Sequence, residues 1–190
     1  MQQKYYGEVN NFYGVIPYWD TILHTLNGFL CAAIGFSLID ILNKNENFHM
    51  KLTPIFVALV AFCFSMTVGV LWEFIEYGAD SILEKDMQKD TIIRDISSVY
   101  LDTEQENTAI KINNINKTLI YSDENGTEKI TEIKNGYLEI GINDTMKDLI
   151  VNLLGAITFS IIGLLYIQDR DGYKFAENFM PILNKKKETK

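Results

Sequence analysis

Three apolar stretches of membrane-spanning length constrain the fold of this chain more than any other feature. They cover residues 21–39, 52–72 and 149–167, and none of them contains Asp, Glu, Lys or Arg. A helix needs about 20 predominantly apolar residues to cross the hydrocarbon core of a bilayer. The sequence therefore predicts a mainly α-helical, polytopic membrane bundle with three transmembrane helices.

Lys and Arg residues near the spans predict the orientation of the chain, because short cytoplasmic flanks carry an excess of these residues. The third span is followed by Arg170, Lys174, Lys185, Lys186, Lys187 and Lys190. We therefore expect a basic cytoplasmic tail at 168–190, a cytoplasmic turn at 43–51 between two helices within 19–83, and an extracytoplasmic segment at 1–18. With no signal peptide visible in that segment, either the first span inserts in reverse or the chain lacks an upstream helix.

The segment at 84–143, predicted to be extracytoplasmic, differs in kind from the spans. Residues 84–144 hold 13 acidic and 7 basic side chains, which account for most of the net charge of -8 and argue against a nucleic-acid partner. From Asp95 onward, β-branched residues alternate with polar ones, as is typical of strands. The Asn-Gly pairs in DENG and KNG favour hairpin turns. This predicts a small inserted β-rich segment before the third helix, 144–167.

Polar side chains gather at the predicted outer end of each span. At about 100° per residue, three groups each share one helix face: Asp20, His24 and Asn27, then Glu73, Glu76 and Asp80, then Asp144, Asp148 and Asn152. Carboxylates near hydrocarbon are unfavourable unless they face protein, water or a partner, so the three stripes are expected to converge. Asp90-Thr91 and Asp144-Thr145 also resemble helix starts, in which Asp caps the first turn.

Such a cluster of carboxylates requires protonation of some groups or a bound cation. Oxygen-rich ligands with one His suit a divalent cation such as Mg²⁺, Mn²⁺ or Ca²⁺ better than they suit Zn²⁺. We predict Glu73, Glu76 and Asp148 as metal ligands. His24, oriented by Asp20, is the predicted general base, so that the candidate catalytic residues are His24, Asp20 and Asp148.

A second interpretation stays open. The same residues also suit interhelical hydrogen bonds, each worth about 1 kcal/mol or less, in a protein without enzymatic activity. Such a protein would bind or sense a cation or a proton, or assemble with envelope proteins. The inner halves of the spans hold almost no ionisable group, which disfavours transport.

Three ordered blocks of sequence resemble a known family. PYWDTILHTLNGFL, WEFIEYGAD followed by DMQKDT, and DTMKDLIVNLLGA are similar to the signature blocks of the YjdF-like inner-membrane proteins, which are themselves similar to VanZ-like proteins. The resemblance implies that Asp20 with His24, Glu73 with Glu76, and Asp148 with Asn152 and Gly155 are the matching positions. It also implies a multi-pass protein of the bacterial plasma membrane in a cell-envelope setting, with further helices ahead of the first block. Our own first hypothesis is an outward-facing acidic site that binds a cation and acts on a lipid or cell-envelope substrate.

Overall fold

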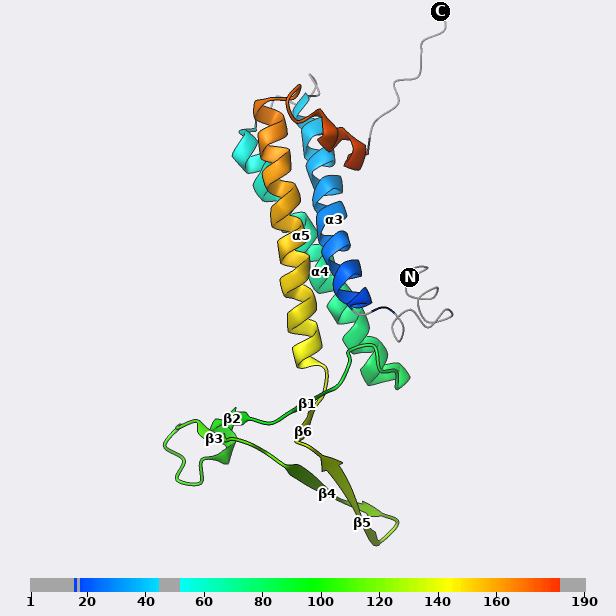
Figure 1. The fold of residues 1–190 in the computed structure, drawn as a ribbon, viewed down its shortest axis with the longest axis vertical. Coiled ribbons are helices and arrows are strands. Elements are labelled where there is room, and N and C mark those ends of the chain that lie inside the picture. The colour runs from blue at the N-terminus through cyan, green and yellow to red at the C-terminus, as the bar shows by residue number, and fades with distance from the viewer. Residues whose placement is uncertain (1–15, 17, 45–51, 182–190) are drawn as a thin grey trace, which may run out of the picture. The chain divides into compact units, whose positions relative to one another are not determined.

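A computed structural model of the chain describes residues 16, 18–44 and 52–181. Within them the fold is mainly helical, as the sequence predicts, with small two-stranded sheets between the second and third long helices (Figure 1). The described residues fall into two compact units, one within 1–76 and 146–190 and the other comprising 77–145. Most of the predicted N-terminal segment, the turn residues 45–51 and the lysines at 185–187 and 190 lie outside the described residues.

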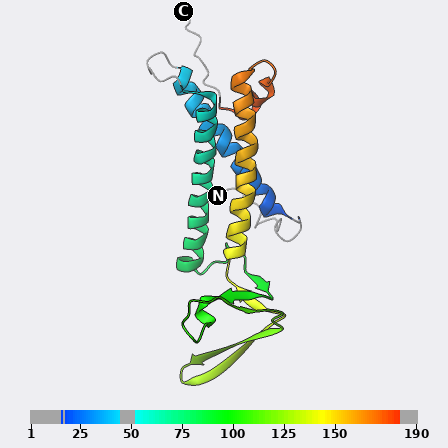
Figure 2. The ribbon, with the colours of Figure 1, turned by 90° about the vertical axis from the view of Figure 1, so that its left-hand side faces the viewer.

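Three long helices form the first unit, and the end of the second helix and the start of the third belong to the second unit. They are α3 (Trp19–Lys44), α4 (Pro54–Leu83) and α5 (Ile142–Gln168), and each is long and apolar enough to cross a membrane. At about 1.5 Å per residue they span roughly 40 to 45 Å, more than a hydrocarbon core of about 30 Å. Figure 2 shows α3 crossing obliquely past the other two helices.

The local sequence accounts for the ends of these helices. Pro54 begins α4, where its missing N–H would have no intrahelical acceptor. Near the end of α3, the side-chain oxygen of Asn43 accepts a hydrogen bond from the backbone N–H of Leu52 at 2.7 Å. This bond ties the end of α3 to the start of α4, so the two helices run in opposite directions.

Large apolar side chains cover much of the exposed surface of the first unit, which is called the helical unit below. On α3 the exposed large side chains recur every four residues and form one ridge: Ile22, Leu26, Leu30, Ile34, Leu38 and Leu42. Acidic and amide side chains are instead among the most buried groups in the unit. This distribution is typical of helices in a bilayer, because lipid solvates apolar side chains but not polar ones.

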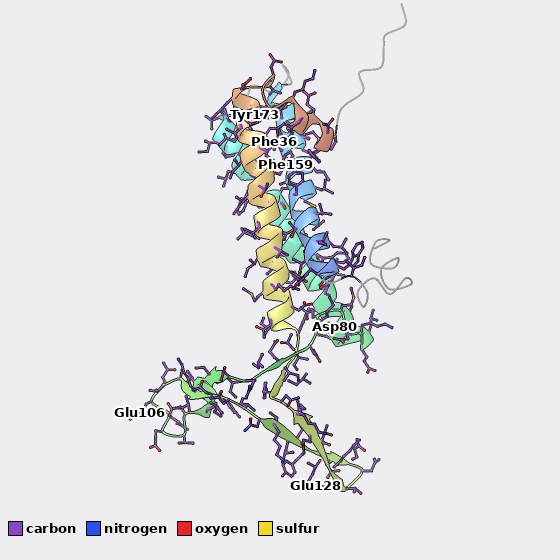
Figure 3. The ribbon with its side chains drawn as sticks, viewed as in Figure 1. Phe36, Asp80, Glu106, Glu128, Phe159 and Tyr173 are labelled. Carbon is purple, nitrogen blue, oxygen red and sulfur yellow. The ribbon has the colours of Figure 1, made fainter. Side chains whose placement is uncertain are left out.

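An aromatic cluster packs one end of the bundle. Phe36 lies 6.1 Å from Phe159 and 6.2 Å from Tyr166 between ring centroids, in edge-to-face geometry (Figure 3). The short 3-10 helix η2 (Lys174–Phe179) packs back onto this cluster through the fully buried Ala176. The described part of the segment expected as a tail therefore belongs to the folded bundle.

The second unit contains three separate antiparallel pairs of strands. β1 (Thr91–Ile93) pairs with β6 (Tyr137–Glu139), β2 (Ile96–Ser98) with β3 (Ile110–Ile112), and β4 (Lys117–Glu124) with β5 (Thr127–Lys134). A 3-10 turn, η1 (Val99–Leu101), follows β2. None of the buried apolar residues of the described chain lies in this unit.

Two local expectations are corrected here. Asp90-Thr91 does not start a helix, because Thr91 opens β1 and its hydroxyl donates to Glu139. The Asn-Gly pair of DENG closes the β4–β5 hairpin as predicted, with positive φ at Asn125 and Gly126. KNG instead joins β5 to β6, which pairs with β1 rather than with β5.

Candidate metal centre

Four ionisable side chains from three helices meet inside the helical unit. His24 comes from α3, Glu73 and Glu76 from α4, and Asp148 from α5. All four are buried, and only 4% of Glu73, 1% of Glu76 and 1% of Asp148 is exposed. The structure therefore brings together the three predicted ligands and the predicted base, from positions up to 124 residues apart.

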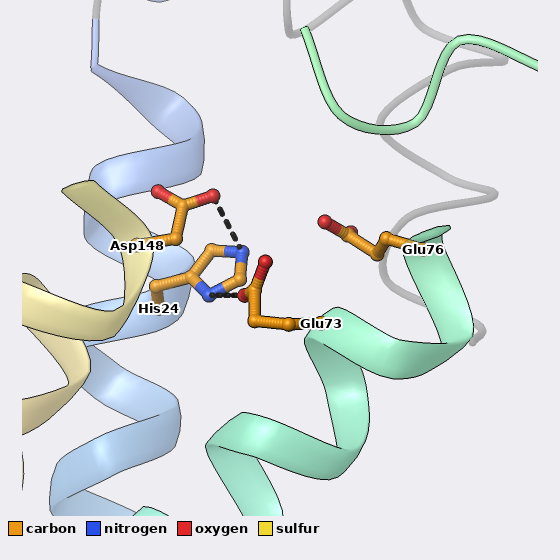
Figure 4. A group of neighbouring side chains, drawn as sticks. All are labelled: His24, Glu73, Glu76 and Asp148. Atoms are coloured by element: carbon orange, nitrogen blue, oxygen red, sulfur yellow. Dashed lines mark ion pairs between the residues drawn. The ribbon is translucent and has the colours of Figure 1, made fainter. Parts of the chain in front are cut away.

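His24 lies at the centre of the group (Figure 4). Its Nε2 atom is 3.3 Å from a carboxylate oxygen of Asp148, and its Nδ1 atom is 3.8 Å from one of Glu73. Glu76 lies one turn beyond Glu73, and its carboxylate points toward the same space. One potential ligand atom from each of these four residues lies within 4.8 Å of every other.

Two neighbours hold members of this group in place. Asp20, one turn before His24 on α3, lies 3.8 Å from the Nε2 atom, on the side that also faces Asp148. The indole N–H of Trp72 donates a hydrogen bond to Glu76 at 2.8 Å. Asp20 thus lies near the imidazole that it was expected to orient, although Asp148 lies closer to the same nitrogen.

A closely packed layer lies one turn deeper in the bundle. Gly28 follows His24 by four residues on α3, and Asn152 follows Asp148 by four on α5. On α4, which runs in the opposite direction, the residue at the same depth is Gly69, four residues before Glu73. A side chain at Gly28 would overlap the backbone of Asn152, and one at Gly69 would overlap its side chain. The layer brings the three helices close enough for their ligand residues to meet.

Ser65 and Asn152 add polar groups to this layer. The buried Ser65 hydroxyl donates to the Gly28 carbonyl at 2.7 Å, and the Asn152 amide nitrogen lies 3.6 Å from the Met66 sulfur. Asn152 is 1% exposed. Asn152, one of the positions that the resemblance matches, therefore faces both other helices.

The dimensions of the group suit a divalent cation. A six-coordinate Mg²⁺ or Mn²⁺ with bonds of about 2.1 Å places opposite ligands about 4.2 Å apart. The observed spread of 4.8 Å therefore needs only small side-chain rotations to close around such an ion. A cation would also offset the repulsion of carboxylates in a site of low dielectric constant, where removing charge from water is unfavourable.

Asp80 and Asp144, the remaining acidic members of the predicted stripes, have other roles within the second unit. The carboxylate of Asp80 accepts hydrogen bonds from the backbone N–H groups of Met87 and Gln88, at 2.6 and 2.7 Å. Asp144 accepts one from the N–H of Lys89 at 3.0 Å. These bonds fix the chain that follows α4, so Asp80 has a structural role there.

The sequence reasoning missed a second polar cluster, near the opposite end of the helices. The buried Asp40 on α3 forms an ion pair with Arg170 at 2.9 Å, and the Arg170 guanidinium lies 4.8 Å from the centre of the Tyr166 ring. The Tyr166 hydroxyl donates to Glu177 at 2.9 Å. Asp40 directly follows the first apolar stretch and Arg170 closely follows the third. These positions, at the same predicted end of two helices, could have suggested the ion pair.

Comparison with known proteins identifies the family of this chain. A profile described as "Predicted membrane protein (DUF2238)" matches residues 3–108, more than half of the chain. The chain belongs to this family. The matched region includes Asp20, His24, Glu73 and Glu76 and ends before α5, so it does not include Asp148.

A relative in Thermotoga maritima carries the description "Uncharacterized protein". It is 36% identical over 77 residues, which cover 40% of this chain and 38% of that protein. The match thus spans well under half the length of the relative. No solved structure matches the chain.

Proposed function

We propose that this protein is an integral membrane protein whose buried His24, Glu73, Glu76 and Asp148 bind one divalent cation. The observation that carries the proposal is the convergence of one ligand atom from each residue within 4.8 Å. Mg²⁺ and Mn²⁺ are the favoured ions, because three of the four ligands are carboxylates.

The contacts favour His24 as a fourth ligand rather than as the general base that the sequence suggested. Its Nε2 side faces Asp20 and Asp148, while its Nδ1 side faces Glu73. A neutral imidazole that donates from Nε2 to a carboxylate presents the lone pair of Nδ1, and such a carboxylate partner is typical of metal-bound histidines. Asp20 then orients the ligand without binding the ion.

We further propose that the site opens toward the outside of the plasma membrane and acts on a lipid or other cell-envelope substrate. The orientation rests on the Lys and Arg residues that flank the spans, and segment 84–143 is then extracytoplasmic. The likeness of the three sequence blocks to YjdF-like and VanZ-like proteins supports an envelope setting. A bound cation would polarise an oxygen of the substrate at such a site.

Metal analysis of the purified full-length protein tests the cation site. After equilibration with Mn²⁺ or Mg²⁺ and removal of free ions, the wild type is expected to retain the metal. Glu73→Gln and Asp148→Asn should each lose most of it, because each replaces a charged ligand by a neutral amide of the same shape. Asp40→Asn is the matched control, since it removes a buried carboxylate outside the site and should leave the metal content unchanged.

The alternative function is structural, and the position of His24 between α4 and α5 favours it. If the cluster only links helices, the wild type binds no metal at millimolar concentration and Glu73→Gln lowers protein abundance. If the cluster is an active site, Glu73→Gln and Asp148→Asn abolish the function of the protein while its abundance stays normal. Retention of the metal by Glu73→Gln would contradict the cation site itself.

A further inference from the structure

The β4–β5 hairpin is the longest sheet element of the second unit, and its outer edges are open. Lys117 pairs with Lys134 at its base and Glu124 with Thr127 at its tip. Within the described chain the sheet contains these two strands only, so one edge of each strand has no neighbouring strand. A two-stranded hairpin is marginally stable by itself in water.

The hairpin also exposes apolar side chains on both faces. Leu119 and Tyr121 point to one face and are 40% and 62% exposed, while Ile120 points to the other and is 45% exposed. The unit to which the hairpin belongs contributes no buried apolar residue to cover them. Exposed apolar residues beside an open strand edge are the features that lead to pairing with another chain.

The two open edges differ in charge. β5 carries acidic and basic side chains along its length, which are Glu128, Lys129, Glu132 and Lys134. Such charges discourage pairing at a strand edge. In β4 the five residues 118–122 are uncharged, and charges occur only at its ends, with Lys117 at one end and Asp123 and Glu124 at the other.

We propose that β4 pairs antiparallel with β4 of a second copy of this chain, forming a four-stranded sheet across the dimer. A two-fold axis normal to the sheet keeps each side chain on its own face, so opposite residues must point to the same face. Only the register centred on Ile120 places opposite charges next to each other at both ends of the paired strands. It places Lys117 opposite the partner's Asp123, Leu119 opposite the partner's Tyr121, and Ile120 opposite the partner's Ile120.

The side-chain chemistry of this register is self-complementary. Opposite charges face each other at both ends, and an aliphatic residue faces an aromatic one on each side of the axis, which are favourable cross-strand pairs. Lys117 already lies 3.7 Å from Glu132 of its own hairpin, so the ammonium would sit between two carboxylates. A slip by two residues would put Leu119 opposite the partner's Asp123 and lose the charge pairing.

Disulfide formation in native membranes tests the pairing. In a Cys31→Ala, Cys63→Ala background, Ile120→Cys should give a covalent dimer on mild oxidation, because Cα atoms opposite each other in an antiparallel pair are about 5 Å apart. Ile130→Cys is the matched control on β5. It is 55% exposed, somewhat more than Ile120, but would lie three strand spacings, about 14 Å, from its copy.

Mixed variants test the register. Leu119→Cys and Tyr121→Cys, co-expressed with different tags, should cross-link to each other. Neither should cross-link to itself, because its copy would lie about 8 Å away, beyond the disulfide limit of about 7 Å.

A protein that remains monomeric with Ile120→Cys, or one that cross-links equally through Ile130→Cys, would overturn the proposal. Cross-linking of Ile120→Cys to a different protein would overturn it as well, by showing that another chain occupies the edge. These outcomes do not depend on metal binding, so this proposal and the proposed function fail separately.

Discussion

Gly155 lies where α3 and α5 approach closely, two turns from Asp148. A Cβ atom at this position would overlap the carbonyl oxygen of Thr25 and would lie 2.8 Å from the backbone nitrogen of Phe29. Backbone atoms cannot move aside by a rotamer change, so Gly155→Ala must push the two helices apart. Thr25 is adjacent to His24, so the displacement acts directly on the proposed ligand group.

We therefore predict that Gly155→Ala destabilises the protein by about 1–3 kcal/mol and weakens metal binding. Thermal unfolding in detergent micelles and titration with Mn²⁺ measure the two effects. Gly78→Ala is the control: a Cβ atom at Gly78 would meet no heavy atom within 4 Å, so this variant should be neutral or stabilising by up to about 1 kcal/mol, through helix propensity. Unchanged stability and affinity in Gly155→Ala would contradict the close packing.

The ion pair of Asp40 and Arg170 predicts that replacing either residue destabilises the protein, but by unequal amounts. Asp40 is buried, whereas the Arg170 side chain is 38% exposed and can be rehydrated. Arg170→Ala removes the cation from a buried carboxylate and should cost about 2 kcal/mol, while Asp40→Ala should cost about 1 kcal/mol. The double mutant should cost less than the sum, and urea or thermal unfolding of all three variants checks this. Equal and additive effects would show that the two side chains are not coupled.

Among the elements, the start of α5 depends on a residue that the sequence reasoning did not select. Glu139 accepts hydrogen bonds from the backbone N–H groups of Ile142 and Asn143, at 2.7 and 3.2 Å, and from the Thr91 hydroxyl at 3.0 Å. Its carboxylate thus satisfies the first free amides of the helix and interacts favourably with the helix dipole. Asp144, the predicted cap, lies within the first turn instead.

These contacts predict how stability depends on pH at this helix end. Burial raises the pKa of Glu139, but the hydrogen bonds from Asn143, Ile142 and Thr91 lower it more, so that the net pKa is below its usual value. A lowered folded pKa means that the carboxylate stabilises the fold above its unfolded pKa of about 4.3 and loses this effect as pH falls through the folded pKa.

Glu139→Gln should therefore lower stability by about 1 kcal/mol at pH 7, and the difference from wild type should shrink below about pH 4. Melting curves in detergent across this range measure it. Glu106→Gln, an exposed loop variant, serves as the control and should show no such gap. A difference that stays constant with pH would exclude the charge of Glu139 as its cause.

The elements themselves were largely predictable. Long charge-free runs and Pro54 indicated α3, α4 and α5, because hydrophobicity over about 20 residues is a strong local signal. Strand alternation likewise located β2 to β6. β1 was missed because its three residues follow Asp90, which suggested a helix cap, and a strand this short carries almost no periodicity of its own.

For the whole molecule, convergence of the site was predictable and pairing in the second unit was not. Helices that alternate in direction must bring the end of α4 back to the depth of the starts of α3 and α5, so residues at the three predicted outer ends could meet. The partnership of β1 with β6, in contrast, joins residues 91 and 139 with no local signal. The Asp40–Arg170 contact, which joins residues 130 positions apart, was missed although both residues flank predicted spans, because the sequence does not show which two flanking charges meet.

The β1–β6 ladder makes the two proposals separable in a single shortened protein. Ile93 is paired with Tyr137, so an Asn-Gly turn can replace residues 94–136 while keeping this ladder and the Glu139 cap. All four proposed ligands lie in the helical unit, so the shortened protein should retain the metal. It should lose dimerisation, because β4 is absent. Metal analysis measures the first property. Cross-linking in membranes with an amine-reactive reagent, compared with the full-length protein, measures the second, because the shortened protein no longer contains residue 120. Loss of the metal would show that the site depends on the β-rich segment, and a persisting dimer would place the interface elsewhere in the chain.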